Sequence, residues 1–211
     1  MIVTLGAVLF GYLIGSLPTG LTVGKIVAGV DVRTVGSHRT GATNVQRSLG
    51  TRAALAVFLL DFGKGLLPVL AVRALTGNDY LTAAAGLAAV AGHVWPIFGD
   101  FRGGRGVATA AGMLAPLAFW ALLIATLCMA LVVALTRYVS LGSIVASMLT
   151  AVLAAVLLGH LVPDSDAGLM AALLAGALVL AKHADNLHRL LHGTESKLGQ
   201  TKTRTTPAAD A

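Results

Sequence analysis

The sequence has little charge. Only 11% of its 211 residues are Asp, Glu, Lys or Arg, whereas 56% are hydrophobic. A soluble domain usually carries about 25% charged residues, so this chain lacks the polar side chains that a water-exposed surface needs. The shortage excludes an ordinary soluble globular fold. The apolar residues instead gather in long runs, and a run of about 20 such residues crosses a bilayer as a helix.

Cysteine and aromatic residues are also scarce. The single cysteine, Cys128, lies within an apolar run, so neither a disulfide framework nor a cysteine-rich metal site is expected. Aromatic residues make up 5% of the chain and are not interleaved with the basic residues, which are spread over short loops and give a net charge of +6. This distribution fits cytoplasmic loops and bound phosphates, and it argues against nucleic acid as a partner.

The apolar runs predict an all-α fold, a polytopic membrane helix bundle with about seven transmembrane helices. The longest run, Val107 to Leu135, is expected to cross twice, with a break near Pro116. Because its first half is short, a re-entrant hairpin is the alternative there. The other expected spans are Ile2 to Val27, Ala53 to Leu75, Leu81 to Phe98, Leu141 to Leu158 and Gly168 to Lys182.

Loop charge predicts the orientation of these spans. Arg and Lys lie in the loops after the first and third spans, at Arg137 and at the C-terminal end, whereas the Asn78-Asp79 turn and the loop from Pro163 to Asp166 have none. The positive-inside rule then places the N-terminus outside and the C-terminus in the cytoplasm. No Lys or Arg precedes the first apolar run, so we expect a span there and no cleavable signal.

The chain is expected to form one transmembrane domain over residues 1–192. The helix of the last span should continue past the membrane through Leu191. Residues 193–211 are rich in Thr and Ser, a composition that predicts a disordered cytoplasmic tail.

Three polar clusters lie on the predicted cytoplasmic side. The first, Gly36 to Arg47, combines small residues, which let backbone N–H groups approach an anion, with hydroxyl, amide and guanidinium donors. An ordinary flexible loop is the alternative interpretation. The candidate site residues of this cluster are Ser37, Gly41, Thr43, Asn44 and Arg47.

The second cluster, Gly92 to Thr109, contains His93 and a glycine-rich loop that leads into a helix, whose N-terminus favours an anion. The loop does not match a Walker A motif, because Arg105 replaces the lysine and Gly106 replaces Ser or Thr. ATP binding is therefore disfavoured. By itself His93 is more often a packing residue than a ligand. The candidate phosphate-binding residues are Arg102, Gly103, Gly104 and Arg105.

The third cluster runs from Lys182 to Glu195. On a helix, His183 and Asn186 are three residues apart and share one face, with Arg189 next along it. An acid/base-capable ring would then lie beside an amide and a guanidinium. A polar helix resting on lipid headgroups is the alternative. The cluster lacks zinc-ligand spacing, so we expect no metal.

Asp61 and Lys64 are charged residues inside the second span. Intramembrane charges are costly and usually pair, and a spacing of three residues lets these two neutralise each other. We interpret them as a structural pair that supports the site, together with His93, Arg189 and Glu195. Ser140 and Ser143, at the start of the sixth span, have the same spacing and are further candidates for substrate binding, although alone they are typical of a helix start.

These motifs resemble those of the PlsY family, integral membrane acyl-phosphate:glycerol-3-phosphate acyltransferases of bacteria. The likeness extends from the first span to about Glu195. It rests on Gly-Ser-x-x-x-Gly-Ala-Thr-Asn-x-x-Arg, on Gly-His-x-x-Pro-x-Phe followed by a glycine-rich loop, and on His-x-x-Asn-x-x-Arg-Leu. The chain departs from the family pattern at His38 to Thr40, where the family usually has Gly-Asn-Pro, and at Arg102 and Arg105, where it usually has lysine.

The resemblance implies transfer of a fatty acyl group from an acyl-phosphate to the 1-hydroxyl of sn-glycerol 3-phosphate. The products would be lysophosphatidic acid and phosphate, in the first step of phospholipid biosynthesis at the cytoplasmic face of the bacterial plasma membrane. An acyl-phosphate is already activated, so no cofactor is expected, and the implied partners are the two substrates and membrane lipid, with no obligatory protein partner. Ser37, Arg47 and Arg105 would contact phosphate, and His183 and Asn186 would orient the reacting groups, with Ser37, His183 and Asn186 as the catalytic residues.

Two other functions stay open from the residues. A transporter or channel for a small phosphorylated anion could use the same arginine-rich loops. Such a path would need polar residues through the bundle, and beyond Asp61 and Lys64 the spans offer none. A non-catalytic relative is the second alternative, which the departure at His38 to Thr40 favours.

Overall fold

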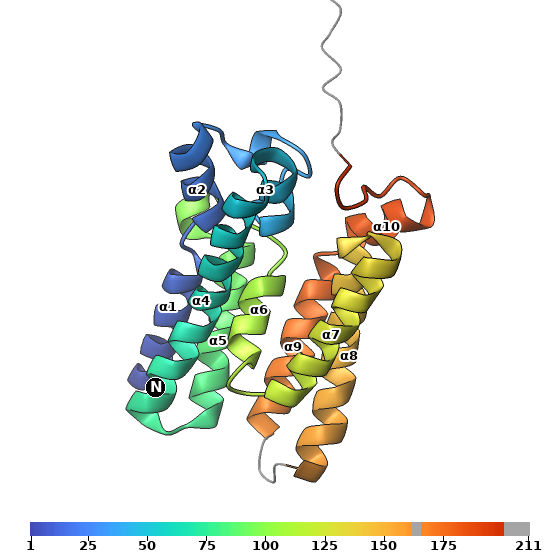
Figure 1. The fold of residues 1–211 in the computed structure, drawn as a ribbon. Coiled ribbons are helices and arrows are strands. Elements are labelled where there is room, and N and C mark those ends of the chain that lie inside the picture. The colour runs from blue at the N-terminus through green and yellow to red at the C-terminus, as the bar shows by residue number, and fades with distance from the viewer. Residues whose placement is uncertain (162–165, 201–211) are drawn as a thin grey trace, which may run out of the picture.

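The computed structural model describes residues 1–161 and 166–200, and within these residues every regular element is a helix. The long helices run alternately up and down in one bundle (Figure 1). The predicted all-α membrane bundle is therefore confirmed. The helices are α1 (Ile2–Gly15), α2 (Thr19–Ala28), η1 (Val32–Thr34), α3 (Ala42–Leu49), α4 (Thr51–Thr76), α5 (Asp79–Val94), η2 (Ile97–Gly99), α6 (Val107–Leu114), α7 (Phe119–Thr136), α8 (Val139–Leu161), α9 (Asp166–Ala181) and α10 (Ala184–Leu191).

Five helical segments are long and apolar enough to cross a membrane, and α9 together with α10 makes a sixth. The remaining candidate, α6, has eight residues, which at 1.5 Å per residue is about 12 Å. That is less than half of the roughly 30 Å apolar layer. Helix α6 alone therefore does not span a bilayer, and the count of seven spans and the orientation of the termini stay predictions.

The break expected near Pro116 is present, because residues 115–118 separate α6 from α7. Two further breaks differ from the sequence prediction. The first span is interrupted between α1 and α2 at Pro18, which has no N–H to donate within a helix. The last helix does not continue through Leu191: it ends at Ala181, and α10 leaves at 55°.

The side chain of His183 explains the end of α9. In an unbroken helix the backbone N–H of residue 183 would donate to the carbonyl of Val179. Here that N–H donates to Leu180 instead, at 2.9 Å, and the ring Nδ1 of His183 donates to the Val179 carbonyl at 2.8 Å. The ring thus takes the acceptor that the next helical turn would have used, and the chain is free to turn.

Close helix packing depends on glycine. A Cβ atom at Gly11 of α1 would collide with the backbone carbonyl of Ala85 on α5, and one at Gly65 of α4 would collide with the carbonyl of Thr109 on α6. Small residues allow this approach in membrane bundles, where packing rather than hydrophobic burial drives helix association. Helices α1, α4, α5 and α6 consequently form one tight group. Helices α2 and α3 contact α4 and complete what we call the α1–α6 group, and α7, α8 and α9 stand beside it (Figure 1).

A buried charge network holds the broken first span against α4. Asp61 and Lys64 are almost fully buried and pair at 2.8 Å. Lys64 Nζ also donates to the carbonyl of Leu17 at 3.1 Å, an oxygen that accepts the backbone N–H of Thr19 as well, and Thr19 Oγ1 donates to Asp61 at 2.5 Å. His93 Nδ1 of α5 lies 3.4 Å from the same carboxylate oxygen. The break in the helix thereby supplies partners that two intramembrane charges need.

Replacing Asp61 should destabilise the protein through its partner. Asp61→Asn leaves the charge of Lys64 buried without its counter-ion, and breaking a buried pair costs about 3–5 kcal/mol in soluble proteins. We expect a lower melting temperature and a lower folded yield in detergent, and we expect Asp61→Asn with Lys64→Met to recover much of both. Asp79→Asn is the matched control, because its ion pair with Arg73 is exposed and such pairs contribute about 0–1 kcal/mol.

A double variant that folds well but lacks activity would contradict the structural role. The pair would then take part in the chemistry.

Candidate functional site

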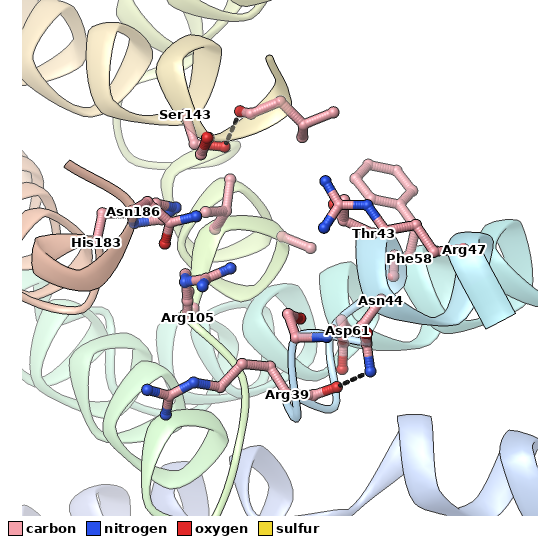
Figure 2. A pocket seen from close by; sticks show the side chains of 18 of the residues that line it. Arg39, Thr43, Asn44, Arg47, Phe58, Asp61, Arg105, Ser143, His183 and Asn186 are labelled. Atoms are coloured by element: carbon pink, nitrogen blue, oxygen red, sulfur yellow. Dashed lines mark hydrogen bonds between the residues drawn. The ribbon is translucent and has the colours of Figure 1, made fainter. Parts of the chain in front are cut away.

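A pocket of about 810 Å³, its mouth included, lies at the end of the bundle where the three polar clusters meet. Figure 2 shows His183 and Asn186 on one side, Arg47 and Thr43 on the other, and Arg105 between them. The predicted convergence of the clusters is therefore present. The polar and glycine residues of the lining are Ser37, Arg39, Gly41, Thr43, Asn44, Arg47, Asp61, His93, Arg105, Gly106, Ser140, Ser143, His183, Asn186 and Glu195.

Five of the predicted residues lie close to the pocket without lining it. Arg102 is exposed, and Gly103 and Gly104 are buried behind Arg105. Lys64 and Arg189 contact lining residues, Asp61 and Glu195 respectively. These five reach the site through a neighbour, if at all.

Asn44 organises the first loop. Its Oδ1 accepts from the backbone N–H of Ser37 at 2.8 Å, and its Nδ2 donates to the carbonyls of Val32 and Arg39, each at 2.8 Å. Gly36 has a φ of 62°, and a Cβ there would collide with Oδ1 of Asn44. The amide of Asn44 is thus occupied by its own loop, a role that the sequence interpretation did not give it.

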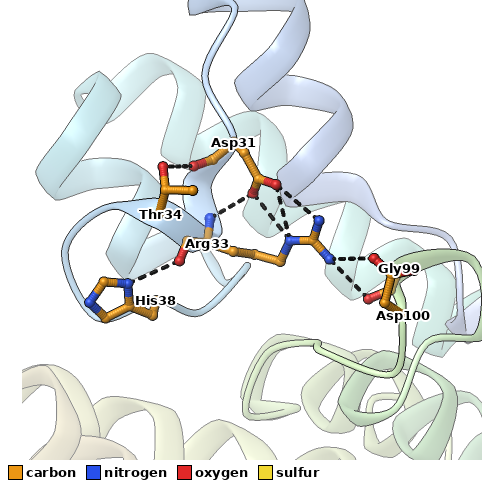
Figure 3. Close-up of polar contacts among 6 residues, drawn as sticks. All are labelled: Asp31, Arg33, Thr34, His38, Gly99 and Asp100. Atoms are coloured by element: carbon orange, nitrogen blue, oxygen red, sulfur yellow. Dashed lines mark hydrogen bonds and ion pairs between the residues drawn. The ribbon is translucent and has the colours of Figure 1, made fainter.

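A second anchor joins this loop to the turn before the glycine-rich loop. The Arg33 guanidinium contacts both carboxylate oxygens of Asp31, the nearest at 2.9 Å, and donates to the carbonyl of Gly99 and the carboxylate of Asp100 (Figure 3). The ring Nδ1 of His38 donates to the carbonyl of Arg33 at 2.9 Å. Arg33 therefore fixes the distance between the loop before α3 and the turn that precedes the glycine-rich loop.

The backbone and ring of His93 pack against the glycine-rich loop. The backbone N–H of Gly104 donates to the carbonyl of His93 at 3.2 Å. A Cβ at Gly103 would collide with the same carbonyl, and one at Gly104 would collide with the ring Nε2. Both glycines are required for this approach, which places Arg105 and the start of α6 at the pocket wall.

Arg47 and Arg105 give the pocket its positive charge. Within the described residues, the Nε atoms of both side chains are buried without a hydrogen-bond partner. Burial lowers the pKa of Arg47 below its usual value and that of Arg105 to about 10, with the charges of Arg39 and Arg189 lowering the latter further. Both guanidiniums stay charged at neutral pH, so an anion between them would relieve their desolvation and satisfy their donors.

On the wall opposite Arg47, Glu195 connects helices α8 and α10. It accepts hydrogen bonds from Ser140 Oγ at 2.9 Å, Asn186 Nδ2 at 2.8 Å and Arg189 Nε at 2.7 Å. Although burial opposes its charge, these bonds lower the pKa of the Glu195 carboxyl below its ordinary value. A carboxylate accepts only, so the amide of Asn186 must turn its NH₂ toward Glu195 and keep Oδ1 as an acceptor for the pocket.

The position of Glu195 corrects the predicted tail. Residues 193–200, which we expected to be disordered, return to the bundle: Arg47 Nη2 donates to the carbonyl of Ser196 at 2.9 Å, and Arg137 and Leu198 exchange hydrogen bonds, each of 2.7 Å. Composition alone missed this because the partners are remote in sequence. Residues 201–211 lie outside the described residues.

His183 is buried beside Asn186, and its tautomer is set by geometry. Because the Val179 carbonyl can only accept, Nδ1 must carry the hydrogen. In the neutral ring, Nε2 is then the free acceptor. His183 and Asn186 together offer two acceptors to the pocket, and each can receive the hydrogen of one hydroxyl group.

An apolar pocket continues from the polar one, between α4 and α6 on one side and α7, α8 and α9 on the other. Both pockets are lined by Phe58, Val107, Ala108 and Met129. Sequence patterns do not single out Phe58 or Met129, because apolar residues within apolar spans are indistinguishable without the fold. The site thus has a cationic end and a hydrocarbon-lined end.

Comparison with known proteins agrees with this geometry. The family described as glycerol-3-phosphate acyltransferase matches residues 5–193. The chain is 45% identical over 203 residues to the glycerol-3-phosphate acyltransferase of Shouchella clausii, covering 95% of this chain and 98% of that one. It is 42% identical to that of Synechococcus sp. strain CC9902, covering 90% and 92%.

Solved structures give the same result. The chain superposes on the crystal structure of PlsY (YgiH), an integral membrane glycerol 3-phosphate acyltransferase, in its glycerol 3-phosphate form, with a TM-score of 0.85, 38% identity and coverage of 93% and 96%. The lysophosphatidic acid form gives a TM-score of 0.83 at 38% identity, with coverage of 93% and 95%. On the strength of the family match and the near full-length relatives, this chain belongs to the glycerol-3-phosphate acyltransferase family.

Proposed function

We propose that the protein transfers a fatty acyl group from an acyl-phosphate to the 1-hydroxyl of sn-glycerol 3-phosphate. The acyltransferase activity follows from family membership; the acyl-phosphate donor is the proposal. The observation that carries it is the junction of a pocket bearing two half-buried arginines with an apolar pocket through Phe58, Val107, Ala108 and Met129. An acyl-phosphate has the same two parts, an anionic head and a hydrocarbon chain.

The reaction needs orientation and charge stabilisation more than a nucleophile from the protein. The 1-hydroxyl oxygen forms a bond to the acyl carbon, the bond from that carbon to the phosphate oxygen breaks, and the hydroxyl proton leaves with the departing phosphate. His183 Nε2 or Asn186 Oδ1 first accepts the single hydrogen bond that the 1-hydroxyl can donate, which aims a lone pair of the hydroxyl oxygen at the carbonyl carbon. The proton then passes from this hydrogen bond to the phosphate oxygen as the ester bond forms. Arg47, Arg105 and Ser37 hold phosphate and stabilise the charge that develops on the leaving group.

The donor is tested with purified protein and palmitoyl-phosphate. We expect release of inorganic phosphate that requires glycerol 3-phosphate and equals the lysophosphatidic acid formed, because attack by the acceptor is the step that frees phosphate. Palmitoyl-CoA should not replace palmitoyl-phosphate, since its leaving group lacks the phosphate next to the acyl carbon. Equal turnover with palmitoyl-CoA would refute the proposed donor.

Substitutions in the pocket should separate binding from chemistry. Arg47→Ala removes a charge-assisted contact to phosphate, so kcat/KM should fall by about 10²-fold; Arg47→Lys should recover only part, because an ammonium lacks the bidentate fork. His183→Ala should act mainly on kcat, and a 10²-fold loss corresponds to about 2.7 kcal/mol of barrier. Steady-state kinetics of folded variants measure both effects.

Two exposed residues provide matched controls. Arg52→Ala and His188→Ala remove an arginine and a histidine that lie outside the pocket lining, and each should leave kcat/KM within about twofold of the unmodified protein. If Arg47→Ala and His183→Ala behave like these controls, the catalytic pocket lies elsewhere.

We propose that the pocket opens to the cytoplasm, in the plasma membrane of a bacterium. The loops with Arg33 and Arg105 lie at one end of the bundle, and the turn at Asn78 lies at the other (Figure 1). Positive loops stay on the cytoplasmic side, which is also the side where phosphorylated metabolites are made.

Cysteine labelling tests this orientation. In a Cys128→Ala background, a cysteine at Asn78 should react with an impermeant thiol reagent added to intact cells, whereas one at Ser48 should react only after the cells are permeabilised. Both positions are exposed. The reverse pattern would place the pocket outside and contradict the proposal.

A further inference from the structure

Arg39 is a third arginine in the pocket wall, and neither the expected site residues nor the mechanism above uses it. It lies in the loop between η1 and α3 and lines the pocket. Figure 2 shows its side chain extended along the edge of the pocket, away from Arg47. At that end, Nη2 donates to Oδ2 of Asp185 on α10, at 3.2 Å.

The ion pair of Arg39 with Asp185 is a weak one. The two side chains are 35% and 61% exposed, and the contact is a single one of 3.2 Å. Exposed pairs of this kind contribute about 0–1 kcal/mol. The backbone of Arg39 is fixed, because its carbonyl accepts from the buried amide of Asn44. The guanidinium can therefore change its partner at low cost while the loop stays in place.

The charges around Arg39 favour an anion as that second partner. Arg39 and Arg105 both line the pocket, and the charge of Arg39, after burial, contributes to the lowered pKa of Arg105. An anion between the two guanidiniums would replace repulsion by attraction on both sides. A phosphate dianion offers a guanidinium two oxygens and two charges, whereas the exposed carboxylate of Asp185 offers one contact.

We propose that Arg39 is a further substrate-binding residue, which exchanges Asp185 for the phosphate of a bound substrate. The ligand chemistry is a phosphate monoester or acyl-phosphate dianion. Glycerol 3-phosphate and the proposed donor both carry such a group, and the experiment distinguishes them. Assignment of Arg39 to the acyl-phosphate rests on the proposed function, whereas assignment to glycerol 3-phosphate does not.

The alternative is a purely structural ion pair, which we call a brace. The loop of Arg39 belongs to the α1–α6 group and Asp185 to α10, so the pair could simply hold the two sides of the pocket together. The two roles predict opposite effects of losing Asp185 on substrate affinity. In a brace, loss of either partner weakens the site equally. In an exchange, loss of Asp185 frees Arg39 for phosphate and strengthens binding, whereas loss of Arg39 weakens it.

The experiment compares Arg39→Gln, Asp185→Asn and the double variant in the full-length protein. Calorimetry gives the Kd for glycerol 3-phosphate without any donor, and steady-state assays give KM for glycerol 3-phosphate and for palmitoyl-phosphate. Arg52→Gln, an exposed arginine outside the pocket lining, is the matched control and should change none of these constants. Melting temperatures verify that each variant is folded.

For the substrate that Arg39 binds, we expect Arg39→Gln to raise Kd or KM about 10-fold and Asp185→Asn to lower it about threefold, because a single charge-assisted contact lies in this range. The double variant should behave like Arg39→Gln. A change in the Kd for glycerol 3-phosphate assigns Arg39 to the acceptor. A change confined to the KM for palmitoyl-phosphate assigns it to the donor.

Equal weakening by both single variants, or unchanged constants for both substrates in Arg39→Gln, would overturn the proposal. Failure of the donor is a separate result. If the unmodified protein binds glycerol 3-phosphate but does not turn over palmitoyl-phosphate, the proposed donor is wrong, and the binding constants for glycerol 3-phosphate alone then decide the role of Arg39.

Discussion

Buried charge that must be neutralised determines how this apolar chain folds. Asp61 is held by Lys64 and Thr19, and Glu195 by Asn186, Arg189 and Ser140. Each carboxylate joins segments that are distant in sequence: the first joins the broken N-terminal span to α4, and the second joins α8, α10 and the segment after it. A buried charge without a partner is costly, most of all inside a span, as at Asp61, so each set of contacts stabilises the arrangement of the segments that it joins.

The need to neutralise charge also gives the two walls of the pocket different polarities. The α1–α6 group supplies the cations Arg47 and Arg105, and the side formed by α8, α10 and residue 195 supplies neutral acceptors and one neutralised carboxylate. Acceptors without net charge can face an anionic substrate without repelling it. In the proposed mechanism a substrate hydroxyl and a substrate phosphate meet complementary walls, so that polarity as well as shape would orient glycerol 3-phosphate.

The sequence predicted the bundle and the convergence of its polar clusters, because both depend on local patterns: apolar runs, loop charge and motif spacing. It did not predict features that depend on distant partners. The turn at His183 requires the ring to reach the Val179 carbonyl in a folded helix, and the order of residues 193–200 requires Arg47 and Arg137. Asn44 looked like a substrate ligand because its type suits one, although its loop uses both ends of its amide.

The apolar pocket that continues from the cationic one has a consequence for how the enzyme meets its reactants. Glycerol 3-phosphate diffuses in three dimensions through water, whereas a molecule with a fatty chain diffuses in two, within one leaflet. The relevant abundance of the acylated species is therefore its mole fraction in the lipid, not its molarity. With the proposed acyl-phosphate as donor, dilution of the membrane with inert lipid would lower the rate at constant total substrate, and the lysophosphatidic acid formed would enter the leaflet that supplied the chain.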